Sequence, residues 1–256
     1  MKEPSRLIDT HCHLELEDFD LDRQSVIEKA RVLGVSIITS AIEKHLWEKG
    51  CAISEAYSNV YAAVGLEVSQ YHDCEIAVDW IRSNNERIIA IGETGLDHYL
   101  IRDHKERNLQ ESCFRSLIAL SKKLALPIQV HSRSAGRKAL EVLGSCDAER
   151  VHMHAFDGKA SLARTASREL GYYFSIPTSV VRSPQKRKLV KAVTIERLLL
   201  ETDSPVLGPE KGIRNEPSNI QVALSETAQI LKMEEEELQE IILENTLRLY
   251  THIQPQ

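Results

Sequence analysis

The sequence lacks several features that define whole classes of protein. Its five cysteines stand singly, with no Cys-x-x-Cys pair. An odd number of scattered cysteines excludes a complete disulfide framework and a cysteine-based zinc knuckle, and it favours the reducing cytoplasm. No run approaches the roughly 20 apolar residues of a membrane-spanning helix, so no membrane partner is expected. The N-terminal stretch MKEPSRLIDTHCHL has no apolar segment typical of a signal peptide, and none is expected.

Basic residues are not in excess either. The formal net charge is −6, so a polyanionic partner would have to be bound by a local basic cluster. What the chain does have is a hydrophobic content of 42%, enough for one large core over 256 residues. Its charged content of 27% is interspersed with apolar runs, which argues against disorder.

The apolar residues form short runs rich in β-branched side chains, and each run is followed by a longer segment with helical periodicity. Strands that alternate with helices predict a mainly parallel sheet, because right-handed crossovers place the helices over its faces. Eight such units favour an α/β fold, a closed (β/α)8 TIM barrel that forms a single domain over residues 1–256. The expected strands are Leu7–Thr10, Val35–Ala41, Val60–Leu66, Ile88–Glu93, Pro127–His131, Val151–His154, Tyr172–Ile176 and Leu198–Glu201.

Helical periodicity is clearest between the fourth and fifth expected strands. There, apolar residues recur every three or four positions, at Leu109, Cys113, Leu117, Leu120 and Leu124. The segment from Ser218 to Thr251 predicts the eighth helix and one extra helix. The other helices are expected over 23–33, 43–58, 134–145, 158–170 and 184–193.

Reactive residue types gather where the expected strands end, which is where barrel enzymes build their active sites. The first strand runs into Asp9-Thr10-His11-Cys12-His13. Because side chains alternate along a strand, His11 and His13 project to one side and Cys12 to the other. Two imidazoles on one side of a strand end can ligate zinc or a similar divalent ion.

Four later strand ends add to this pair. Glu93 follows an apolar strand, and His131, His154 and Asp203 stand at the ends of the fifth, sixth and eighth strands. Each alone could be a cap, a salt bridge or a core histidine, but their common location favours one metal site. Asp97 stays open between two roles, orienting a ligand histidine or stabilising a turn.

Several motifs are ordered along the chain: DTHCHL (9–14), IGETGLDHY (91–99), LPIQVHSRSA (126–135), HAFDG (154–158), ETDSPVL (201–207), NEP (215–217) and ENTLRLY (244–250). With this set the chain resembles the TatD family of metal-dependent hydrolases, a branch of the amidohydrolase-like barrels, nearly from end to end. The resemblance implies two divalent metal ions (Zn, Mg or Mn). Its implied ligands are His11, His13 and Asp203 for one ion, His131 and His154 for the other, and Glu93 bridging both.

The resemblance leaves one ligand to be chosen. The family usually has Cys where this chain has Ala155, and this chain carries an extra histidine, His152. Alternation directs His152 and His154 to the same side, so either could be the ligand. The FDG that follows favours His154 and predicts a hydrogen bond in the barrel interior for His152.

Catalytic roles are expected for Asp203 and Glu93. Two ions about 3.5–4 Å apart would lower the pKa of a bridging water, and Asp203 could accept its proton as general base. Arg133, just after a ligand histidine, and Arg214, in the loop after the last strand, are the expected phosphate contacts. Tyr99 could stack on a base or pack within its loop.

Three functions compete. The leading one is a metal-dependent deoxyribonuclease that hydrolyses phosphodiester bonds at single-stranded or frayed DNA ends. The second is an ester or amide hydrolase with the same metals, such as a D-aminoacyl-tRNA deacylase. The third is a binding or scaffolding barrel with a vestigial metal, against which the six intact ligand positions argue. The oligomeric state is not predicted.

Overall fold

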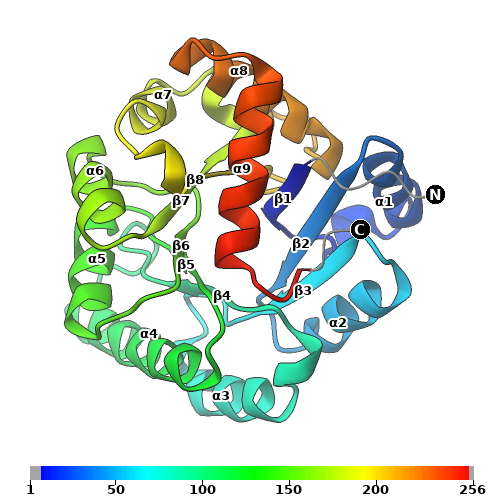
Figure 1. Ribbon diagram of the computed structural model, residues 1–256. Helices are drawn as coiled ribbons and strands as arrows, with labels where there is room; N and C mark the ends of the chain where they lie inside the picture. The colour runs from blue at the N-terminus through cyan, green and yellow to red at the C-terminus, as the bar shows by residue number, and fades with distance from the viewer. Residues whose placement is uncertain (1–6, 254–256) are drawn as a thin grey trace.

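The protein folds into one sheet of eight parallel strands that curls into a barrel with helices around it (Figure 1). The computed structural model describes residues 7–253. Neighbouring strands follow chain order, and the ring closes between the last strand and the first. There the Asp203 N–H donates to the His11 carbonyl at 2.9 Å, and the His13 N–H donates to the Ser204 carbonyl at 2.8 Å. The predicted TIM-barrel fold is confirmed.

The strands lie close to the expected positions. They are β1 (Leu7–Cys12), β2 (Val35–Ala41), β3 (Val60–Val64), β4 (Ala90–Gly95), β5 (Ile128–His131), β6 (Val151–Met153), β7 (Tyr173–Pro177) and β8 (Leu198–Glu201). The α-helices are α1 (Arg23–Val32), α2 (Trp47–Ala56), α3 (Cys74–Ser83), α4 (His104–Leu124), α5 (Gly136–Ser145), α6 (Ala160–Glu169), α7 (Pro184–Val190), α8 (Ile220–Leu231) and α9 (Glu235–Leu249).

Two expectations about these elements were wrong. The fourth strand begins and ends two residues later than expected, so Glu93 lies inside β4. Helix α3 was not predicted from the sequence. Its apolar face is nevertheless regular: Cys74, Ala77, Val78 and Ile81 recur at helical spacing. Ala77 and Ile81 are buried and the other two pack against the core, so the sequence does carry a signal for this helix.

One end of the barrel is closed by the extra C-terminal helix. Figure 1 shows α9 running across this end of the strands. Leu249 and Tyr250 at the end of α9 pack in one apolar cluster with Ile8, Ala90 and Tyr173, at or near the amino ends of β1, β4 and β7. The carboxyl ends of the strands, which carry the expected ligands, therefore lie at the opposite end. No helix within residues 7–253 combines the length and apolarity needed to cross a membrane.

Candidate metal centre

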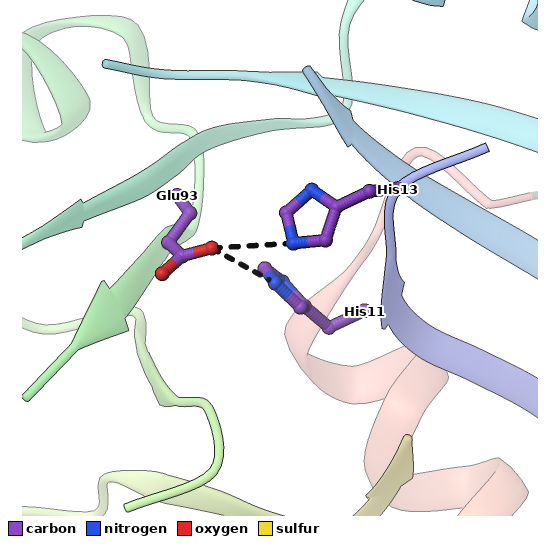
Figure 2. A group of neighbouring side chains, drawn as sticks. All are labelled: His11, His13 and Glu93. Carbon is purple, nitrogen blue, oxygen red and sulfur yellow. Dashed lines mark hydrogen bonds and ion pairs between the residues drawn. The ribbon is translucent and has the colours of Figure 1, made fainter. Parts of the chain in front are cut away.

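Glu93 lies at the centre of the expected ligands. Its Oε2 is 3.2 Å from His11 Nε2 and 3.5 Å from His13 Nε2 (Figure 2). Its Oε1 is 2.6 Å from His131 Nδ1 and 3.0 Å from His154 Nε2. The two oxygens of one buried carboxylate thus face two different histidine pairs, one from β1 and one from the ends of β5 and β6.

Asp203 completes the group from the loop after β8. Its Oδ1 is 3.7 Å from His11 Nε2 and 3.6 Å from His13 Nε2, and only 7% of the residue is exposed. The backbone of Asp203 has φ 55°, in the left-handed region that non-glycine residues rarely adopt. Such strained residues often lie at functional sites, where the surrounding structure holds them in place.

Local irregularities in two strands aim the ligands. The register between β1 and β2 shifts between Asp9 and Cys12, and that between β4 and β5 shifts between Ile91 and Thr94. Bulges of this kind redirect a side chain, and these two lie beside His11 and Glu93. The GETG motif also needs its second glycine: Gly95 has φ 143°, and a Cβ there would lie 2.1 Å from a backbone carbonyl.

Asp97 has both of the roles left open by the sequence. Its Oδ2 accepts a hydrogen bond from His131 Nε2 at 3.1 Å, which turns Nδ1 of that ring toward Glu93. Its Oδ1 accepts from the backbone N–H groups of Tyr99 and Leu100 at 2.9 and 2.7 Å. The carboxylate therefore holds the turn and orients the histidine at once.

Two more histidines are oriented in the same way. His13 Nδ1–H donates to the Ser40 carbonyl at 2.8 Å, and His11 Nδ1–H donates to Gln129 Oε1 at 3.1 Å. These partners assign the proton to Nδ1, so the unprotonated Nε2 of each ring faces the shared centre. Neutral imidazole nitrogens and carboxylate oxygens are the donor set of zinc and similar divalent ions, so the residues fit a metal site.

A chain of buried hydrogen bonds runs beneath this centre and includes His152. Gln129 Nε2 donates to the Tyr250 hydroxyl at 2.9 Å, and that hydroxyl lies 2.6 Å from His152 Nδ1. On the other side, His152 Nε2 lies 2.6 Å from Ser175 Oγ, which donates to Glu201 Oε2 at 2.6 Å. The predicted interior hydrogen bond of His152 is confirmed, and His154 is the histidine that reaches Glu93.

Burial and charge set the protonation of these groups. Burial lowers the pKa of His152 to about 3, so this ring is neutral. Burial also opposes protonation of His131, but hydrogen bonds to Asp97 and Glu93 raise its pKa to about 9. For Glu93, burial favours the protonated acid, but the positive charge of His154 and hydrogen bonds from the other rings hold its pKa well below the usual range. The centre thus attracts cations, protons or metal ions alike.

A cavity of about 470 Å³ opens beside the centre, lined by His131, His154 and Asp203 among others. Its wall also includes Lys186, only 9% exposed, which was not among the expected site residues. In the sequence it stands within the cationic run of α7, where nothing distinguishes it from solvated lysines. Burial lowers the pKa of Lys186, whereas the charges of Glu201, Asp157 and Asp203 oppose this shift.

The two expected phosphate contacts differ in their surroundings. Arg133 lines the cavity, and its guanidinium carbon lies 3.9 Å from the centroid of the exposed Tyr99 ring. Arg214 instead forms an ion pair with Asp22 at 2.6 Å and lies over the Phe19 ring. Its charge is already balanced, so its contact with a phosphate stays a prediction.

Comparison with known proteins matches almost the whole chain. The family model described as TatD related DNase matches residues 8–251. The human protein named deoxyribonuclease TATDN3 is 39% identical over 259 residues, which cover 95% of this chain and 94% of the human one. YabD of Bacillus subtilis (strain 168), described as an uncharacterized metal-dependent hydrolase, is 35% identical, with 95% and 98% covered. The crystal structure of YjjV, a TatD homolog from Escherichia coli K12, matches with a TM-score of 0.88 at 27% identity, covering 97% and 99%.

Proposed function

Since the chain belongs to the family of TatD-related deoxyribonucleases, we propose that it hydrolyses phosphodiester bonds at DNA ends, at a site that holds two divalent metal ions. It is a metal-dependent hydrolase, in keeping with the names of its relatives. The observation that carries the two-ion proposal is the position of Glu93. A carboxylate with one oxygen toward each of two histidine pairs has the arrangement of a bridging ligand.

In this proposal the six ligands are His11, His13, Glu93, His131, His154 and Asp203, with His11, His13 and Asp203 around one position and His131 and His154 around the other. Divalent ions, when bound, supply Lewis acidity that acidifies water and offsets phosphate charge. The chain's own contribution is to hold neutral imidazoles in one orientation. Asp203, beside the first histidine pair and open to the cavity, accepts the proton of the attacking water.

The cavity supports a nucleic-acid substrate. Arg133 on its wall presents a planar guanidinium suited to phosphate, and Tyr99 beneath it offers a face on which a base could stack. A cavity of about 470 Å³ beside the proposed ligands suits one unpaired strand end better than a continuous duplex. We therefore propose single-stranded or frayed ends as the preferred substrate, with Arg214 as a second, more distant phosphate contact.

The proposal extends to the setting of the protein. All five cysteines are free thiols, as in proteins of a reducing compartment, so we place the protein in the cytoplasm. We also propose that residues 1–256 form one catalytic domain.

The direct test is an activity panel with purified protein, stripped by a chelator and then reloaded with Zn²⁺, Mg²⁺ or Mn²⁺. The substrates are end-labelled single strands, blunt and frayed duplexes, misacylated transfer RNA and simple phosphate esters. We expect metal-dependent shortening of DNA from its ends, fastest for single strands. The chelated protein and Asp203→Asn serve as controls for contaminating nucleases.

Two results would contradict the proposal. Release of the amino acid from transfer RNA without DNA cleavage would assign the site to ester hydrolysis. Equal DNA cleavage by wild type and Asp203→Asn would place the activity outside this centre.

A further inference from the structure

Lys186 is a buried lysine on the wall of the cavity that also exposes three of the metal-ligand residues. Its Nζ donates hydrogen bonds to the carbonyls of Ala155 and Phe156 at 2.6 and 2.9 Å. An ammonium group has three N–H donors. Within residues 7–253, these two carbonyls are the hydrogen-bond acceptors of Nζ, which leaves the third donor available to a molecule in the cavity.

The residues whose carbonyls accept from the Lys186 ammonium, Ala155 and Phe156, lie directly after one of the proposed metal ligands. Ala155 follows the ligand His154 and has φ 36°, a left-handed conformation that is unfavourable for alanine. In this conformation its N–H donates to Glu201 Oε1 at 2.8 Å while its carbonyl accepts from Lys186. The strained residue therefore fixes the ammonium next to the ligand cluster, rather than at the protein surface.

Hydrogen bonds to the Ala155 and Phe156 carbonyls would not by themselves require a lysine. A buried charge is unfavourable unless other charges compensate for it, and a neutral donor could hold the same two carbonyls. The compensating charges here are the carboxylates of Glu201, Asp157 and Asp203. Of these, Asp157 and Asp203 also line the cavity, so the ammonium and the metal ligands surround one space.

We infer that Lys186 binds a non-bridging oxygen of the substrate phosphate in this cavity, as a substrate-contacting residue of the reaction. The inference rests on the proposed phosphodiester hydrolysis and names a second anion-binding group on the cavity wall, besides Arg133. Lys186 and the ligand cluster then contact the same phosphate. A charge-assisted hydrogen bond of this kind is short, strong and insensitive to base sequence.

Inorganic phosphate is the probe for this site. Its affinity is measured by calorimetry on Mg²⁺-loaded wild type, Lys186→Met and Lys188→Met. Lys188 is an exposed lysine on the same helix and serves as the matched control. We expect Lys186→Met to weaken phosphate binding by about 10-fold or more, the usual effect of losing a hydrogen bond to a charged group. Lys188→Met should bind phosphate as wild type does, and all three proteins should contain equal metal.

A second measurement uses the wild type, in case Lys186→Met does not fold. The ¹⁵N resonance of the Lys186 side chain is followed while phosphate is added, and we expect it to shift with the same affinity as the calorimetric binding. Phosphate binding within about two-fold of wild type in a folded Lys186→Met, or an unmoved resonance at saturation, overturns the inference. A protein that cleaves no DNA yet binds phosphate through Lys186 supports this inference and contradicts the proposed function instead.

Discussion

Removal of the metal ions should reverse the pH dependence of stability. In the metal-free protein the pKa of His131 is raised from 6.5 to about 9, against the opposing effect of burial, by Asp97 and Glu93. A group whose pKa is raised on folding stabilises the protein fully below its unfolded pKa, and this contribution is lost as pH rises through the folded pKa. The metal-free protein should therefore lose stability between pH 6 and pH 8.5.

The size of this loss follows from linkage. With pKa values of 6.5 unfolded and about 9 folded, the contribution of His131 falls by about 2 kcal/mol between pH 6 and pH 8.5. The raised pKa values of His13 and His154 act in the same direction. Bound metal requires neutral rings, so the loaded protein should instead gain stability as the pH rises through 6.5.

Urea unfolding at several pH values, with a chelator and separately with saturating metal, measures both curves. Asp97→Asn is the matched control, because it retains the shape of the partner of His131 but removes its charge. This variant should show a smaller loss in the metal-free state. A metal-free wild type with constant or increasing stability from pH 6 to 8.5 would refute the reasoning.

Three further outcomes are expected. Asp203→Asn should keep the wild-type circular dichroism while turnover falls by two to four orders of magnitude, roughly the contribution of a general base; near-normal turnover would contradict that role. His154→Ala should bind fewer metal equivalents in elemental analysis and His152→Ala the normal number, and the opposite pattern would exchange their assignments. In a catalytically inactive variant, a plot of log affinity for single strands against log salt concentration should have a slope of about −1.5 to −2. Arg133→Ala should make this slope shallower by somewhat less than about 0.7, the value of one phosphate contact. A salt-independent affinity would contradict the nucleic-acid substrate.

The convergence of the proposed ligands could be predicted because its rules are local and repetitive. Alternation along β1 places His11 and His13 on one side, and parallel strands bring their carboxyl ends together, so Glu93 and Asp203 converge from distant parts of the chain. The motifs then separate ligands from ordinary polar residues. His154, just before the FDG motif, lies past the end of β6 and contacts Glu93. His152 lies two residues earlier, inside the strand, and its side chain bonds to Ser175 in the barrel interior.

What the sequence could not show depends on contacts between distant segments. Lys186 stands among several cations of one helix, and only the packing of α7 decides which of them is buried. Arg214 looks like a free loop cation, but Asp22, almost 200 residues earlier, neutralises it. Gln129 lies in the LPIQVHSRSA motif, but nothing in that motif shows that its amide joins His11 to Tyr250 at the far end of the chain.

That last connection gives α9 a role beyond closing the barrel. Tyr250 follows the helix directly, is fully buried, and takes up the middle of the chain of hydrogen bonds beneath the centre. With His152 neutral, the donors can all run one way: Gln129 to Tyr250, then to His152 and Ser175, and finally to the carboxylate of Glu201. His11 enters this chain at one end, and Glu201, 3.7 Å from His154 Nδ1, ends it at the other. Tyr250, directly after the C-terminal helix, thus supports the amide that orients His11 and lies in a chain that ends beside His154, so we expect loss of that helix to disturb the candidate metal centre as well as the core.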